Sequence, residues 1–138
     1  REIMIQFEVE IKFTLKEKRR IKEWLNLVAF EEGNKIQNLN FLIVGDKRMI
    51  HFNKTYLNHD YSTDIITFDN AENKKISGDI VISIERVKEN SKKYKVKLED
   101  ELRRVMVHGL LHLLGYDDKN EKEKKRIRKK ENYYLERY

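Results

Sequence analysis

The chain has 138 residues, and its 30 lysines and arginines against 24 acidic residues give a net charge of +6. The length predicts one domain over residues 1–138, because domains usually contain roughly 100–200 residues. Hydrophobic and charged residues make up 39% each, which predicts a soluble globular protein rather than a disordered chain or a membrane protein. The sequence has no cysteine, which excludes disulfides and thiol nucleophiles, so any metal ion must be held by histidines and carboxylates.

The N-terminal segment predicts a strand followed by a helix. Residues Ile3–Ile11 alternate apolar and polar side chains from Ile5 onward, which is the pattern of a strand with one buried face. Thr14–Glu17 has the sequence of a capping box, which would satisfy the first free N–H groups of a helix. Apolar residues at helical spacing follow over residues 21–29, and Gly33 ends the run.

The middle of the chain predicts three further strands. Leu39–Val44 is mostly apolar, which indicates an inner strand covered on both faces. Asp46 can then cap a short helix. Asp64–Phe68 and Asp79–Ser83 have strand composition, and the polar stretch Asp69–Gly78 between them is expected to be a surface loop.

The C-terminal part predicts three helices, over Glu85–Tyr94, Leu98–Leu114 and Lys119–Tyr138. The second helix opens with acidic residues and becomes almost wholly apolar from Val105, so we expect it to be central and buried. The order of elements predicts an α+β fold, with a small mixed β-sheet and helices packed mainly on one face.

The central helix carries the most informative pattern, His-x3-His-x2-Gly-x2-Asp. Four residues of helix place His108 and His112 one above the other on the same face. Gly115 can end the helix in a left-handed conformation and turn Asp118 back towards the two imidazoles. Two histidines and one carboxylate would leave a zinc ion with an open position, as in a catalytic site, with one ion per chain. The alternative is a pair of partly buried histidines that hydrogen bonds satisfy.

The same spacing occurs in metzincin proteases, but Gly109 stands where those enzymes carry the glutamate that serves as general base. A small zinc metallopeptidase is therefore disfavoured, although it stays an alternative. Hydrolysis of a phosphodiester depends less on that group, because a metal ion can itself generate hydroxide and neutralise phosphate charge. The positive net charge also favours a polyanionic partner.

Three segments resemble the YbeY family of bacterial endoribonucleases. His108–Asp117 reproduces the metal signature of that family, and Asp60–Phe68 and Gly78–Ser83 resemble two of its strands. The resemblance implies a single-strand-preferring endoribonuclease of rRNA maturation and ribosome quality control, with zinc as cofactor and the ribosome or its small subunit as partner. A ribosome-binding module with a structural metal is a further alternative. No apolar run is long enough to cross a bilayer, so we expect a cytoplasmic protein.

The sequence departs from the family pattern at two places. The third ligand of the family is usually histidine, whereas here that position holds Asp118, preceded by Asp117. The family also tends to place an arginine, implicated in catalysis, where this chain has Leu57, which leaves Lys54 and His59 as substitutes. The general base is unassigned, with His59 and Asp117 as candidates for proton transfer.

The last helix is rich in positive charge and could follow an RNA backbone. The candidate RNA-binding residues are Lys54, Arg126, Lys129 and Lys130, with Tyr133, Tyr134 or Tyr138 available to stack on bases. The alternative for this helix is a solvated face with tyrosines packed on the core. Thr63 and Asp64 could orient a metal-bound histidine, or they could cap the turn before their strand.

Overall fold

The computed structural model describes residues 4–59, 63–71 and 74–138. The strands are β1 (Met4–Val9), β2 (Ile36–Val44), β3 (Ile65–Asp69) and β4 (Ile76–Ser83). The helices are α1 (Lys18–Glu31), α2 (Asp46–Phe52), α3 (Ile84–Tyr94), α4 (Leu98–Leu113) and α5 (Glu121–Leu135), and a π-helical turn η1 (Asn53–Leu57) continues α2. Ile3 and Asp60, at the starts of two predicted segments, lie outside the described residues.

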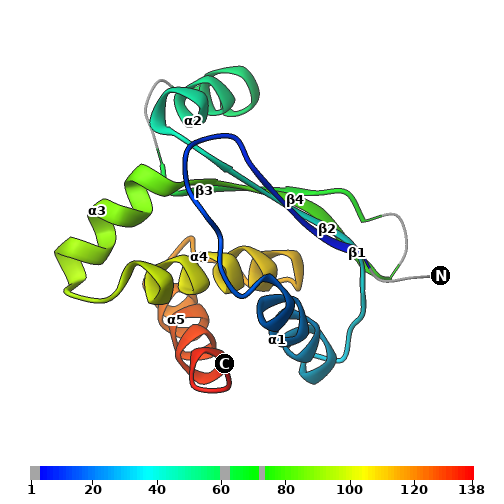
Figure 1. Ribbon diagram of the computed structural model, residues 1–138. Helices are drawn as coiled ribbons and strands as arrows, with labels where there is room; N and C mark the ends of the chain where they lie inside the picture. Colours follow the sequence, from blue (N-terminus) through cyan, green and yellow to red (C-terminus); the bar gives the residue numbers. More distant parts are fainter. Residues whose placement is uncertain (1–3, 60–62, 72–73) are drawn as a thin grey trace.

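The four strands form one mixed sheet in the order β1-β2-β4-β3. β1, β2 and β4 are parallel, while β3 pairs with β4 in the antiparallel sense. Helices α1, α4 and α5 lie on one side of the sheet, and α2 lies on the other (Figure 1). The predicted α+β class, with helices mainly on one face, is confirmed.

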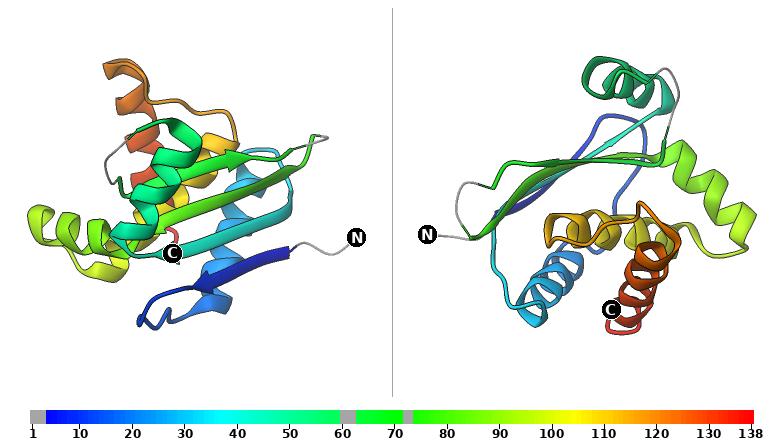
Figure 2. Two further views of the ribbon diagram at one scale, coloured as in Figure 1. Left: turned by 90° about the horizontal axis from the view of Figure 1, so that it is seen from above. Right: turned by 180° about the vertical axis from the view of Figure 1, so that it is seen from behind.

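The main core lies between the sheet and α4, which is central as its apolar composition predicted (Figure 2). From β2, Leu39, Phe41 and Ile43 are buried in this core. The opposite face of β2 is only partly covered, since Leu42 is half-buried and Asn38 is exposed. The predicted inner strand is confirmed, since β2 lies between β1 and β4 and every residue of Leu39–Val44 is buried or half-buried; the exposed Asn38 lies before the predicted range.

Two predicted helix caps were wrong. Glu17 is itself the residue before α1 and has a left-handed backbone with φ 59°, so it cannot occupy the third helical position of a capping box. Its carboxylate instead accepts hydrogen bonds from Arg20 and from the hydroxyl of Tyr138. Asp46 lies inside the first turn of α2, with Gly45 at the capping position, and its carboxylate accepts a hydrogen bond from the hydroxyl of Ser83.

Two predicted boundaries also shift. Strand β4 begins at Ile76, so the surface connection after β3 is shorter than Asp69–Gly78. Helix α5 begins at Glu121 rather than Lys119, because the side chain of Asn120 caps it by accepting from the N–H of Glu123 at 2.9 Å. In the part of the chain that the structure describes, we find no helix with the length and apolar character needed to cross a membrane.

Candidate metal centre

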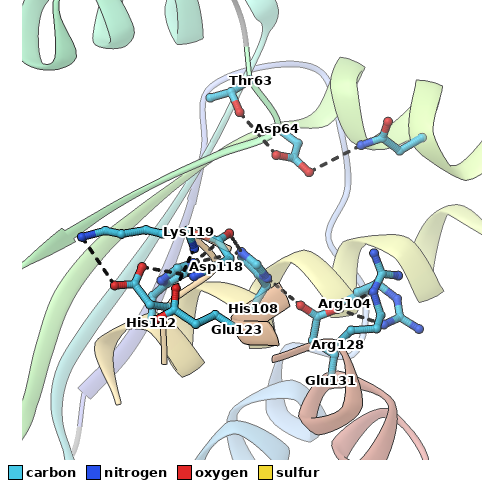
Figure 3. A network of polar contacts seen from close by, with 12 residues as sticks. Thr63, Asp64, Arg104, His108, His112, Asp118, Lys119, Glu123, Arg128 and Glu131 are labelled. Atoms are coloured by element: carbon cyan, nitrogen blue, oxygen red, sulfur yellow. Dashed lines mark hydrogen bonds and ion pairs between the residues drawn. The ribbon is translucent and has the colours of Figure 1, made fainter. Parts of the chain in front are cut away.

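Helix α4 presents His108 and His112 on one face, and a tight turn at its end brings Asp118 against them (Figure 3). Gly115 has φ 106°, a conformation that glycine adopts at little cost. The N–H of Tyr116 donates to the carbonyl of Leu111, and the N–H of Gly115 donates to that of His112, each at 3.0 Å. These two bonds form a Schellman motif, which ends the helix and reverses the chain.

The three side chains form a compact triangle of ligand atoms. Nε2 of His108 lies 3.1 Å from Nε2 of His112, and Oδ2 of Asp118 lies 3.4 Å from each of them. Zinc bonds of about 2.0–2.2 Å in a tetrahedral arrangement would separate two ligand atoms by about 3.3–3.5 Å. The nitrogen and oxygen donors therefore fit zinc both in chemistry and in spacing.

Glu131 of α5 holds His108 from the other side of its ring. Its Oε2 lies 2.5 Å from Nδ1 of His108, so the ring is fixed with Nε2 facing the triangle. The second oxygen of Glu131 accepts from Nη1 of Arg104 at 2.9 Å. A carboxylate that accepts from the outer nitrogen of a ligating histidine orients the ring and raises its basicity. Glu131 is 3% exposed, so water competes little for this bond.

His108 and Glu131 shift each other's pKa. Burial alone would lower the pKa of His108, but its hydrogen bond with Glu131 and the neighbouring carboxylates raise it above the ordinary value. Burial alone would raise the pKa of Glu131, yet the bond with His108 and the charge of Arg104 lower it. Because zinc binds a deprotonated ring nitrogen, a metal ion competes with a proton for Nε2 of His108.

Gly109 faces the sheet rather than the triangle. A Cβ atom at this position would come within 2.9 Å of the side chains of Ile65 and Ile80. The residue after His108 is therefore packed closely between α4 and the sheet, and a larger side chain would require both isoleucines to shift. The position that carries the general base in metzincins is not open to solvent here.

Asp64 lies at the start of β3, above His108 in Figure 3. Its carboxylate accepts from the hydroxyl of Thr63 at 3.5 Å and from the amide of Asn90 at 3.4 Å, and burial raises its pKa. Leu57 lies with Thr63 and His112 around a cavity of about 480 Å³ beside the triangle. Leu57, where the family resemblance predicts an arginine, thus lies beside the candidate site.

The two candidates for proton transfer lie on different segments: Asp117 is in the turn after α4, next to Asp118, and His59 follows η1. Oδ1 of Asp117 accepts from the N–H of Asp118 at 3.1 Å, so Asp117 is fixed within the turn. Its other oxygen lies 3.7 Å from Nζ of Lys119. His59 follows η1, is exposed, and is not one of the described residues that line this cavity. Lys54 lies on η1 and is also exposed.

The candidate RNA-binding residues of α5 lie apart from the metal centre. Nζ of Lys130 lies 3.0 Å from Oε2 of Glu32 at the end of α1, and the guanidinium of Arg126 lies over the ring of Tyr116. Lys129 is exposed, and the hydroxyl of Tyr134 also donates to Glu32. The α5 cations beside the metal centre are others: Lys124, Lys125 and Arg128.

Sequence reasoning did not single out Glu131. A signal was present in the spacing of Ile127, Glu131 and Tyr134, because positions i, i+4 and i+7 share one helix face and all three are buried. A glutamate between two core residues of an otherwise charged helix needs a buried partner.

Comparisons of the sequence with a family model and with known relatives identify one family. The family model described as Endoribonuclease YbeY matches residues 4–138. The chain is 47% identical to the Endoribonuclease YbeY of Karelsulcia muelleri over 96% of this chain and 94% of the relative, and 46% identical to that of Cytophaga hutchinsonii over 97% and 94%. Among solved structures, the solution structure of TM1509 from Thermotoga maritima superposes with a TM-score of 0.70 at 29% identity, covering 96% of this chain and 87% of that one.

Proposed function

The chain belongs to the endoribonuclease YbeY family, and we propose that it cleaves single-stranded ribosomal RNA at a zinc ion held by His108, His112 and Asp118. The enzyme is a metal-dependent hydrolase of a zinc-dependent family whose members act in rRNA maturation. The observation that carries the proposed ligand set is the triangle of two Nε2 atoms and one Oδ2 atom with the spacing of zinc ligands.

Zinc bound there would leave a position for water or a phosphate oxygen, lower the pKa of that water, and neutralise charge on the phosphate. The residues of the chain prepare the centre for this chemistry. Glu131 fixes the ring of His108, and the turn after Gly115 fixes Asp118. Asp117 and His59 are the proposed proton-transfer candidates, and the pH–rate profiles of Asp117→Asn and His59→Gln would distinguish them.

The substrate class is tested with zinc-loaded protein on single-stranded RNA, double-stranded RNA and casein. We expect cleavage of single-stranded RNA that a chelator abolishes and that weakens steeply with salt. His112→Ala serves as the control for a contaminating nuclease. Cleavage of casein with RNA left intact would replace the proposal by a metallopeptidase.

The third ligand is tested by three variants titrated with zinc against a competing chelator. Asp118→Asn should weaken zinc binding strongly, whereas Asp118→His should retain it, because imidazole is an equally competent zinc ligand. Asp117→Asn should also retain zinc, since Asp117 is bonded within the turn. Zinc lost in Asp117→Asn and kept in Asp118→Asn would move the ligand to Asp117.

The same proposal makes the ribosome or its small subunit the partner and the cytoplasm the compartment, with residues 1–138 acting as one hydrolase domain. The family membership and the net charge of +6 support a polyanionic partner. Co-sedimentation of the protein with ribosomal subunits, compared with free rRNA fragments, tests this assignment.

A further inference from the structure

A groove of about 430 Å³ opens beside the metal centre, between the end of α3 and helix α5. This α3–α5 groove is lined by Asn90 and Tyr94 on one side and by Lys124, Lys125 and Arg128 on the other. His108 and Asp118 also line it, so that an occupant would touch the metal centre. Its volume lies within the roughly 300–1,000 Å³ that is usual for ligand clefts.

The two most buried carboxylates of the α3–α5 groove lie on its floor, and Asp64 and Asp118 line it beside the metal centre. The acidic side chains of Glu101 and Glu131 are buried at 6% and 3% exposure, with Arg104 bonded to Glu131. The side chains of Lys124 and Arg128 are 59% and 61% exposed. An anionic ligand would therefore meet the cationic rim of α5 before it reached the acidic floor.

The opposite side of the groove offers an aromatic ring. Tyr94 ends α3 and is 54% exposed, with the amide of Asn90 one turn before it. A ligand that fits both sides has a flat unsaturated part for the ring and an anionic part for α5. A nucleotide has both, because its base can stack on an aromatic side chain while its phosphate contacts lysine and arginine.

We propose that the α3–α5 groove binds the nucleotide next to the cleaved phosphodiester of single-stranded RNA, with its base on Tyr94 and its phosphate at Lys124, Lys125 and Arg128. This subsite rests on the proposed function, since it takes its substrate from the reaction at the neighbouring metal centre. A base within a duplex is stacked and paired, and so cannot cover the ring of Tyr94. The groove thus supplies a physical reason for preferring single strands.

The cavity on the other side of the triangle differs in charge. Its described lining residues include Leu57, Thr63, Asp69 and His112, but neither lysine nor arginine. Among the described residues, lysine and arginine thus line the groove but not this cavity. The RNA should accordingly be bound mainly on one side of the cleaved phosphodiester bond.

The phosphate contacts are tested with zinc-loaded protein and a short single-stranded RNA that carries 2′-O-methyl phosphorothioate linkages and resists cleavage. The triple variant Lys124→Gln, Lys125→Gln, Arg128→Gln should bind this probe on the order of tenfold more weakly. The slope of log affinity against log salt should fall in magnitude by about 0.7, because each neutralised phosphate of a single strand adds roughly 0.7 to that slope and the groove binds one phosphate.

The matched control removes the same charge from exposed positions of α1, outside the groove: Lys18→Gln, Arg19→Gln and Lys22→Gln. We expect the control variant to keep most of the affinity and the salt slope, with melting temperatures of both variants near that of the unaltered protein. Equal weakening by the two triple variants would overturn the subsite, because net charge alone would then explain binding.

The base contact is tested at Tyr94. Tyr94→Ala should weaken binding of the same probe on the order of tenfold, whereas Tyr94→Phe should bind normally, because the ring is retained. A probe containing 5-iodouridine should crosslink to Tyr94 on irradiation, and peptide mass spectrometry locates the linkage. Normal binding by Tyr94→Ala, or crosslinks confined to other elements, would contradict the proposal.

Cleavage assays separate this proposal from the proposed function. Groove-dependent binding without any zinc-dependent cleavage of RNA would reject the reaction and keep the subsite. Normal cleavage of single-stranded RNA by the groove variants, with unchanged probe affinity, would reject the subsite and keep the reaction.

Discussion

Helix α5 takes part in two networks, each built around a little-exposed carboxylate. Towards α4, Glu131 accepts from His108 and Arg104. Towards α1, Glu32 accepts from the hydroxyls of Tyr116 and Tyr134 and from Nζ of Lys130. The two carboxyl side chains are similarly shielded, at 4% and 12% exposure.

The two networks differ in what the donor side chains contact besides the carboxylate. The donors to Glu32 are two hydroxyl groups and one ammonium group, so their hydrogen bonds join α5 and the turn before it to the end of α1. The main donor to Glu131 is a ring whose other nitrogen faces Asp118 and His112. Similar burial therefore serves stability in one network and the orientation of a candidate metal ligand in the other.

The largest effect should come from His108, which links Glu131 to the metal centre. His108→Ala removes one of three proposed ligands and should cost several kcal/mol of zinc affinity, against roughly 10–16 kcal/mol for structural zinc sites. Competition with a chelator measures the change. Tyr134→Phe, which removes a donor to Glu32, is the matched control and should bind zinc normally; zinc loss in the control instead would break the distinction between the networks.

Glu131→Gln should have the next largest effect on zinc. The amide keeps the shape of the carboxylate but loses the charge that holds the His108 ring and raises its basicity, so zinc affinity should fall by about 10–100-fold. The visible spectrum of the cobalt-substituted protein should also change, because the ligand ring is held differently. Unchanged affinity and spectrum would show that Glu131 only pairs with Arg104.

On the other side of α5, Glu32→Gln should reduce stability without affecting zinc affinity. Hydrogen bonds to a charged, little-exposed carboxylate contribute about 1.5–3 kcal/mol, and the variant weakens several at once. We expect a loss of about 1–3 kcal/mol in the free energy of unfolding, measured by urea denaturation of the metal-free protein. A stable variant with impaired zinc binding would reverse the roles assigned to the two carboxylates.

The sequence revealed those parts of the centre that local geometry fixes. Helical spacing alone places His108 beside His112, and the single glycine after the helix indicates the turn that carries Asp118. The α+β class likewise follows from local patterns of two and 3.6 residues, which are independent of how the elements pack.

Contacts between residues that only packing brings together could not be predicted from local sequence patterns. Glu131 is 23 residues from His108 in the chain, and α5 is so rich in charge that its apolar spacing only weakly marks the buried face. The charge pattern of α5 likewise predicts Lys130 to be a candidate RNA-binding residue, whereas in the fold its Nζ donates to Glu32 at the end of α1. The predicted capping box is also wrong, since Glu17 stands before α1 and accepts a hydrogen bond from Tyr138, which lies 121 residues away.

The smallest effect expected is a pH dependence confined to the Glu32 network. Burial alone would raise the pKa of Glu32, but its bonds with Tyr134, Tyr116 and Lys130 lower it below the ordinary value of 4.5. A carboxyl whose pKa is lower in the folded state adds stability above its unfolded pKa and loses it as the pH falls through the folded value. The difference in unfolding free energy between the unaltered protein and Glu32→Gln should therefore be full near pH 6 and shrink below about pH 4.5. Urea denaturation of both proteins across this range measures it, and a difference that stayed constant down to pH 3 would show that the bonds to Glu32 do not depend on its charge.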